Sequence, residues 1–111
     1  MIGDETPSLY TTKSLNASAG TNNIYSFGTA TWSSAHIDYN ISSGSNYRAG
    51  CMVAVFTDST VEFSEYSTID VGNTTTGINA VTFSFTNSGG NSIFQIITST
   101  NYNIKAIIRA I

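Results

Sequence analysis

Short runs of alternating apolar and polar residues fill the chain from residue 35 to residue 111. Alternation with a period of two places successive side chains on opposite faces of a β-strand. The runs are separated by glycine, asparagine, serine and threonine, which favour turns. The pattern predicts strands at 22–32, 35–41, 47–57, 61–66, 79–85, 92–99 and 103–111, with a continuation at 68–71. Seven or eight such strands predict an all-β fold, an antiparallel β-sandwich or jelly roll.

The alternation also assigns faces to the clearest strands. The residues expected to point into the core are Ile37, Tyr39, Ile41, Cys51, Val53, Val55, Val81, Phe83 and Phe85. The residues expected on the opposite faces are His36, Asp38, Asn40, Met52, Ala54 and Phe56. Gly28 suggests a bulge or a close backbone approach in the first strand. The glycines of the 87–91 loop are expected to supply positive φ in a hairpin.

The last two strands are apolar on both faces. Strand 103–111 carries Ile107 and Ile111 opposite the face of Ile104 and Ile108, and its neighbour 93–97 is similar. Strands of this kind are usually covered on both sides. In so small a domain the second cover is most simply another subunit. The predicted subunit interface therefore comprises Ile93, Ile97, Ile107 and Ile111.

The first 21 residues lack a clear pattern of either period, so they are predicted to form an extended N-terminal arm. The arm contains the one proline of the chain and a few isolated apolar residues. Arms of this kind tend to become ordered on a partner surface. The residues expected to anchor the arm on such a surface are Ile2, Pro7, Leu9, Tyr10 and Leu15. The predicted organisation is thus an arm at 1–21 and a sandwich domain at 22–111.

Composition narrows the classes of function. Charged residues make up 10% of the 111 residues, and serine, threonine and asparagine supply about two residues in five. A net charge of −3 with four scattered basic residues argues against nucleic acid as a partner. The N-terminus lacks the basic and apolar blocks of a signal peptide, and no apolar stretch reaches membrane-spanning length. We therefore expect a soluble protein that does not insert into membranes and is not secreted by the standard route.

The candidate chemistry is sparse. Cys51 would need a base, for which His36 is the one histidine, and Asp38 could orient that base. A small buried cysteine and a polar strand face explain the same residues without catalysis. Asp58, Glu62 and Glu65 lack the glycine-centred spacing of a calcium loop. We therefore predict no enzymatic activity, no metal and no cofactor.

The aromatic residues allow two interpretations. Seven tyrosine and tryptophan side chains could form a sugar-stacking platform, or they could serve the core and an interface. The second interpretation is favoured. The residues concerned are Tyr10, Tyr25, Trp32, Tyr39, Tyr47, Tyr66 and Tyr102.

From residue 35 onward, the order of features resembles a β-sandwich domain of virion proteins in tailed bacteriophages. The matching stretches are 36–41, the Gly44 loop, 47–55, 81–85, the 88–91 turn and 104–111, about two thirds of the chain. Such domains occur at tail-fibre tips and in small head or tail decoration proteins. The resemblance implies a chemically inert, trimer-forming domain located in the virion and made in the host cytoplasm.

A self-contained domain with an arm and no repetitive shaft favours a capsid decoration, or cement, protein. The expected partners are copies of the same chain in a homotrimer and another virion protein, either the major capsid protein or a tail component. The alternative is the receptor- or glycan-binding tip of a tail fibre, whose partner would be a host surface glycan.

Overall fold

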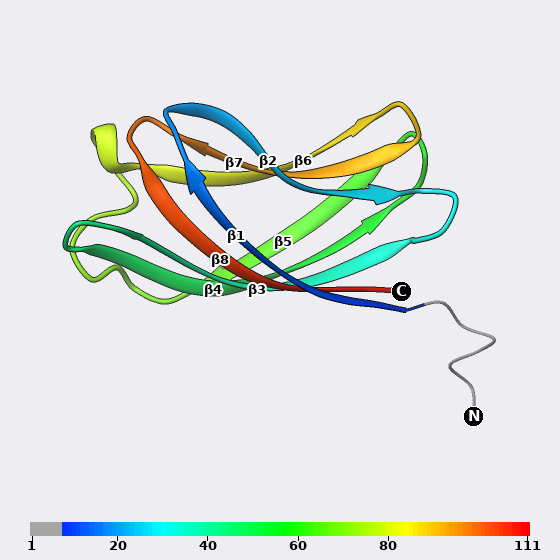
Figure 1. Cartoon of the computed structure of the whole chain (residues 1–111), viewed down its shortest axis with the longest axis horizontal. Coiled ribbons are helices and arrows are strands. Elements are labelled where there is room, and N and C mark those ends of the chain that lie inside the picture. The colour runs from blue at the N-terminus through cyan, green and yellow to red at the C-terminus, as the bar shows by residue number, and fades with distance from the viewer. Residues whose placement is uncertain (1–7) are drawn as a thin grey trace.

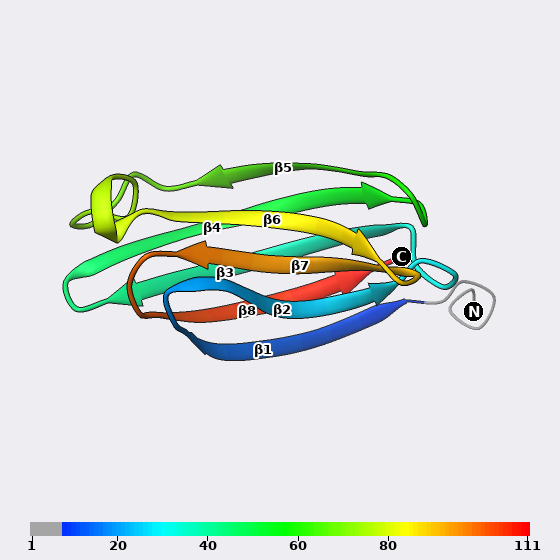
Figure 2. The ribbon, with the colours of Figure 1, turned by 90° about the horizontal axis from the view of Figure 1, so that it is seen from above.

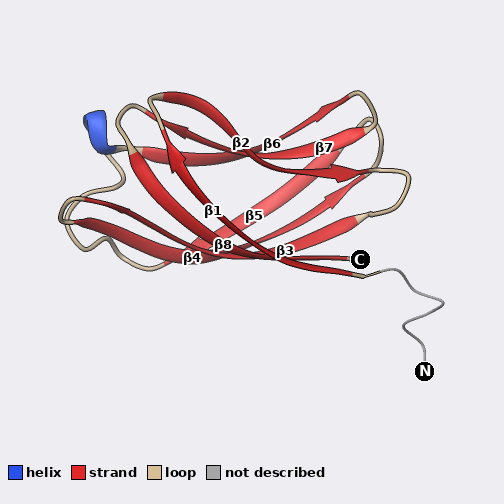
Figure 3. Ribbon diagram, viewed as in Figure 1, coloured by secondary structure: helices blue, strands red, loops and turns tan. Residues whose placement is uncertain are grey.

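The computed structural model describes residues 8–111, which form a sandwich of two antiparallel β-sheets (Figures 1 and 3). Within that range there are eight strands and one turn of 3-10 helix, η1 (Gly77–Asn79). The strands are β1 (Leu9–Ala17), β2 (Gly20–Gly28), β3 (Ser34–Ser43), β4 (Asn46–Phe56), β5 (Val61–Ser67), β6 (Val81–Ser88), β7 (Asn91–Thr98) and β8 (Tyr102–Ala110). The prediction of an all-β sandwich of seven or eight strands is confirmed.

The larger sheet has five strands in the order β1-β8-β3-β4-β5, and the smaller has three in the order β2-β7-β6. Viewed from above, the strands of both sheets run along the long axis of the molecule (Figure 2). In this view β1 and β2 lie toward one edge of the sandwich, and β5 and β6 lie toward the other. The two sheets therefore pack with their strands nearly aligned, as is usual in sandwiches.

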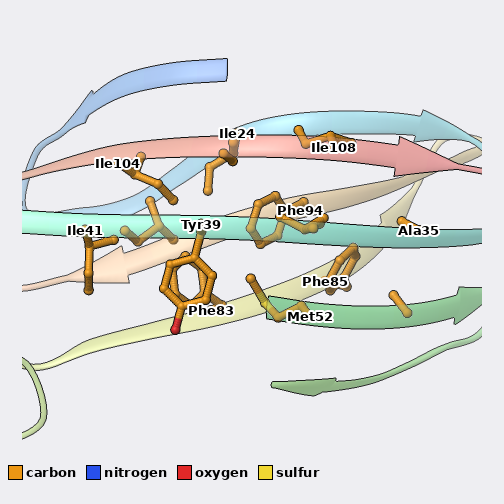
Figure 4. Packing of buried hydrophobic residues seen from close by; sticks show 14 of the residues in the cluster. Ile24, Ala35, Tyr39, Ile41, Met52, Phe83, Phe85, Phe94, Ile104 and Ile108 are labelled. Atoms are coloured by element: carbon orange, nitrogen blue, oxygen red, sulfur yellow. The ribbon is translucent and has the colours of Figure 1, made fainter. Parts of the chain in front are cut away.

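The core lies between the sheets, where inward side chains from both layers meet (Figure 4). Phe94 on the smaller sheet lies between Phe83 and Phe85, with ring centroids 5.6 and 5.2 Å away. The larger sheet contributes Tyr39, whose ring centroid is 4.6 Å from that of Phe83. Such offset aromatic pairs add stabilisation beyond the apolar area they bury. The inward residues predicted for 35–41 and 79–85 are all buried, so those two assignments are confirmed.

Two tight hairpins follow from glycines in the left-handed region. Gly44 has a φ of 59° between β3 and β4, and Gly89 and Gly90 have φ values of 59° and 81° between β6 and β7. Glycine adopts this backbone without the clash that a Cβ atom would cause. The predicted positive φ in the 87–91 loop is confirmed.

The predicted N-terminal arm is wrong where the structure describes it. Leu9–Ala17 form β1, which pairs with β8 from Leu9↔Ala110 to Ala17↔Tyr102. Leu9 and Leu15 are half-buried against the core, and Tyr10 points away from it, so none of the three belongs to a free arm. The sandwich therefore begins at residue 9 and not at residue 22. Ile2 and Pro7 lie outside the described residues.

The sequence hid β1 because it is an edge strand. Its inward positions include Thr11 and Lys13, which pair with the buried residues Ile108 and Ala106 of β8, yet Thr11 is only half-buried and Lys13 is exposed. An edge position tolerates such residues, so the alternation is weak there. Backbone pairing with β8 keeps β1 in the sheet, and such pairing cannot be recognised from the alternation of side chains.

The faces predicted for β4 are reversed. Met52, Ala54 and Phe56 are buried, whereas Val53 and Val55 are exposed and Cys51 is half-buried. All six residues from Cys51 to Phe56 are apolar, so period-two alternation cannot choose a face. The bulge in β2 lies at the register shift between Asn23 and Tyr25, and not at Gly28, which ends the strand.

Candidate functional site

The face of the larger sheet that points away from the core, here called the outer face, is the most distinctive surface of the molecule. Strand pairing brings its residues into rows that cross the sheet. The central rows are Tyr10-Arg109-His36-Val53-Ser64, Thr12-Ile107-Asp38-Cys51-Tyr66 and Ser14-Lys105-Asn40-Ala49. Residues that oppose each other across strands share a face, so each row forms a continuous strip.

Exposed apolar side chains concentrate on this outer face. Residues 8–111 contain twelve large hydrophobic residues that are exposed, and eight of them lie there. Tyr66 is 65% exposed and Val55 is 57% exposed. The eight residues are Tyr10, Tyr47, Val53, Val55, Tyr66, Val71, Ile107 and Ile111. Exposed apolar side chains gathered on one face in this number indicate an interaction site.

The four residues predicted as a subunit interface do not form one surface. Ile107 and Ile111 belong to the outer face just described. Ile93 and Ile97 project from β7 on the far side of the smaller sheet, because their neighbours Phe94 and Ile96 point into the core. The two pairs therefore lie on opposite sides of the sandwich.

The polar residues on the outer face do not assemble a catalytic pair in the described structure. Arg109 Nη2 lies 4.0 Å from Asp38 Oδ2, and both side chains are more than half exposed. Cys51 lies across from Asp38, whereas His36 lies across from Val53, so the cysteine and the histidine are diagonal neighbours. A nucleophile and its base need hydrogen-bond contact. No hydrogen bond joins these two described residues. The absence of enzymatic activity stays a prediction.

The three acidic residues considered for a metal point in different directions. Glu62 lies on the outer face, across from Val55, whereas Glu65 points inward and binds Arg48. Across residues 8–111, no three His, Cys, Asp or Glu side chains gather as metal ligands would. Nor does any helix in that range have the length and apolar character that a membrane crossing requires.

A buried polar cluster centred on Arg48 was not predicted from the sequence. The Arg48 side chain is 8% exposed. Its Nε donates to the Tyr39 hydroxyl at 3.2 Å, and Nη2 donates to Glu65 Oε2 and to the Val81 carbonyl, both at 3.3 Å. Nη1 donates to Thr74 Oγ1 at 3.2 Å. Because a buried charge must be paired and hydrogen-bonded, this arginine ties β4 and β5 to the loop before β6.

Tyr39 completes the cluster by donating its hydroxyl hydrogen to Glu65. Burial raises the pKa of Tyr39 well above its usual value, and the hydrogen bond to Glu65 adds to the rise. Burial likewise raises the pKa of Tyr102, whose hydroxyl donates to the Asn79 carbonyl at 2.7 Å. Both tyrosines therefore stay protonated and act as hydrogen-bond donors.

Asp70 organises the loop between β5 and β6. Its carboxylate accepts hydrogen bonds from the Thr74 hydroxyl at 2.5 Å, the Thr75 hydroxyl at 2.6 Å and the Thr74 amide at 2.8 Å. These hydrogen bonds, led by that from the Thr74 hydroxyl, lower the pKa of Asp70 to about 2. Aspartate with threonines four and five residues later, inside a polar loop, is a signal for such local capping.

The same loop exposes Ile69 and Ile78 to solvent. It lies at the end of the sandwich opposite the end where β1 begins and β8 finishes (Figure 1). The β3–β4 turn lies at this end too, and Tyr47 follows it directly.

Comparison with known proteins finds similarity in solved structures alone. No family model matches the sequence. No curated protein matches it either. Among solved structures, the chain is similar to the tailspike protein of the Acinetobacter phage vB_ApiP_P1, with a TM-score of 0.42 and 11% sequence identity. The similarity covers 96% of this chain and 23% of the tailspike chain, so the chain spans less than a quarter of that protein's length.

Proposed function

We propose that this chain is a structural protein of a tailed-bacteriophage virion, and that it decorates the capsid as a homotrimer. The order of strands and turns in residues 35–111 that resembles phage virion sandwiches supports this proposal. The protein acts by joining neighbouring subunits, and it needs no cofactor for that role.

The apolar outer face is the observation that carries the proposal. Eight exposed large hydrophobic residues on one face of a 111-residue chain are unfavourable in water. Covering them gains roughly 25 cal/mol per Å² of apolar area, before the costs of association. A protein that carries such a face functions in contact with another protein surface.

Particles purified from the source phage provide the test. Antibodies raised against the purified chain and coupled to gold should label heads at many sites in electron micrographs. Heads that lack the chain should release their genome at a lower temperature than complete heads. Particles without label at any position would contradict the proposal.

The alternative function is a receptor-binding tail-fibre tip. The loop at 68–80 favours it, because Ile69 and Ile78 are exposed at the end of the sandwich remote from where β1 begins and β8 finishes. Gold label confined to the tail tips would support this alternative. The purified chain would then bind host cells, and the double substitution Ile69→Ser and Ile78→Ser would weaken that binding.

A further inference from the structure

We propose that the outer face of the larger sheet is covered by a second copy of this chain, and that the outward face of the smaller sheet takes no part in self-association. The inference rests on the proposed assembly function and names its partner and surface. It assigns self-association to Ile107 and its neighbours and removes Ile93 and Ile97 from the predicted interface.

The outer face is large enough for a stable contact. Strands about 4.8 Å apart, with a rise of about 3.3 Å per residue over 7 to 11 residues, give a five-stranded face of about 24 by 30 Å. This area of about 700 Å² is close to the roughly 800 Å² that one partner buries in an interface of standard size. The sandwich therefore offers enough surface for association without rearrangement.

The charges on the outer face are compatible with contact to a second copy of the chain. Lys105 and Arg109 contribute two positive charges, and Asp38 and Glu62 contribute two negative ones, so the face is neutral (2 − 2 = 0) although the chain carries −3. A neutral face meets another copy of the chain without net repulsion, whereas nucleic acid would require a positive surface. Arg109 and Asp38 already neighbour each other within one copy.

The outward face of the smaller sheet has a different character. Gln95 on β7 donates to Asn23 Oδ1 on β2 at 2.8 Å and accepts from the Thr86 hydroxyl on β6 at 3.0 Å. This polar ladder crosses all three strands, and its groups satisfy one another. Threonines flank Ile97 on both sides, at Thr21 and Thr82. A polar face with internal hydrogen bonds is compatible with water and does not need a partner.

Two isoleucines form a matched pair for the test. Ile107 and Ile97 have the same side chain and the same exposed fraction, 38%, and each lies on a strand inside its sheet. Lysine is preferred to aspartate, because an aspartate at position 107 would lie opposite Asp38 on β3 and the two like charges would repel within one copy. Each variant adds one positive charge. A difference in assembly between the two variants therefore depends on which face carries the lysine and not on the added charge.

The experiment is sedimentation equilibrium of the full chain and of the variants Ile107→Lys and Ile97→Lys, with folding checked by circular dichroism. The wild type and Ile97→Lys should sediment at a multiple of 11.8 kDa. Ile107→Lys should sediment at 11.8 kDa, with a dissociation constant raised at least about tenfold. If Ile107→Lys does not fold, Tyr66→Lys, at a more exposed edge position, takes its place.

Three results would overturn the inference. Dissociation of Ile97→Lys with an intact Ile107→Lys assembly would move the contact to the smaller sheet, and the proposed assembly function would stand. If the wild type is a monomer and antibodies against it still label phage particles, another virion protein covers the outer face. If the wild type is a monomer and the antibodies label no particle, the proposed function is contradicted as well.

Discussion

Arg48 and Arg109 carry the same charge in opposite surroundings. Arg48 is buried among Tyr39, Glu65 and Thr74, whereas Arg109 is 53% exposed and 4.0 Å from Asp38. We expect Arg48→Met to lower the free energy of unfolding by about 1–3 kcal/mol, because it leaves buried hydrogen-bonding groups without a partner. The expected loss is moderated by Glu65, whose side chain is 26% exposed and can be hydrated. Urea denaturation of the purified protein measures the change.

Arg109→Met is the matched control. An exposed ion pair contributes at most about 1 kcal/mol, so the control should unfold nearly as the wild type does. Equal effects of the two substitutions would contradict a structural role for the Arg48 cluster.

Asp70 should make stability depend on pH in acid. Its pKa of about 2 in the folded protein lies below the ordinary value of 3.8, so its ionised form favours the folded state. That contribution is complete above about pH 5, decreases as the pH falls below 3.8, and is lost as the pH falls through about 2. The difference in melting temperature between wild type and Asp70→Asn should therefore shrink between pH 4 and pH 2.

Thr75→Val offers a second readout for Asp70. It removes one donor to the carboxylate, so nuclear magnetic resonance should show a higher pKa for Asp70. An unchanged titration would mean that this hydrogen bond does not hold the carboxylate in solution.

Sequence patterns predict single residues well where the two faces of a strand differ. Ile37, Tyr39 and Ile41 alternate with polar residues, and all three are buried. In β4 both faces are apolar, so the pattern alone could not tell Met52 from Val53. The burial of Arg48 was not predicted for another reason: burial of a charge depends on partners such as Glu65, which lies 17 residues away.

At the scale of strands, Gly50 of β4 lies where β5 approaches the backbone of β4 closely. A Cβ atom at this position would lie 2.2 Å from the Tyr66 carbonyl oxygen and 2.9 Å from the Tyr39 hydroxyl. Gly50→Ala should therefore displace the edge strand β5 and cost about 1–3 kcal/mol. Gly28→Ala is the control, because its nearest neighbour would be 4.0 Å away and its φ is not positive. Thermal melting compares the two, and equal melting temperatures would contradict the close approach.

The assignment of β1 to the sandwich leads to a truncation experiment. Deletion of residues 1–18 removes all of β1 and leaves β8 unpaired along that edge. We expect this variant to unfold or aggregate, since the exposed backbone of β8 would seek another strand. Deletion of residues 1–7 preserves the eight strands and serves as the control. Circular dichroism and solubility report the outcome, and a folded 19–111 fragment would show that the sandwich does not need β1.

Among the elements, every strand except β1 was predicted with bounds that differ by at most four residues from those observed. The alternation of β3 and β6 and the glycine turn between β6 and β7 are local signals that survive in the sequence. The order of strands could not be derived in this way. The pairing of β1 with β8 joins residues about a hundred positions apart, and backbone pairing leaves no mark on side-chain pattern.

For the whole molecule, the distribution of surface chemistry matters more than its average. The smaller sheet presents a polar ladder to solvent, and the larger sheet presents valine, tyrosine and isoleucine. The sequence indicated an excess of outward apolar residues but could not place them on one side, because sheet membership depends on the topology. Ile93 and Ile107 therefore looked equivalent until the two sheets were known.

Self-association through the outer face should also appear in thermal unfolding. When only the folded state associates, mass action stabilises it, so the melting temperature rises with protein concentration. We expect this rise for the wild type and for Ile97→Lys over about a hundredfold range of concentration. Ile107→Lys should melt at one temperature throughout, because its folded state is a monomer.

Differential scanning calorimetry at matched salt measures the melting temperatures of all three proteins. A wild-type melting temperature that does not depend on concentration would mean that the folded chain does not associate in that range. A rise in all three proteins would instead mean that the copies associate through residues other than Ile107.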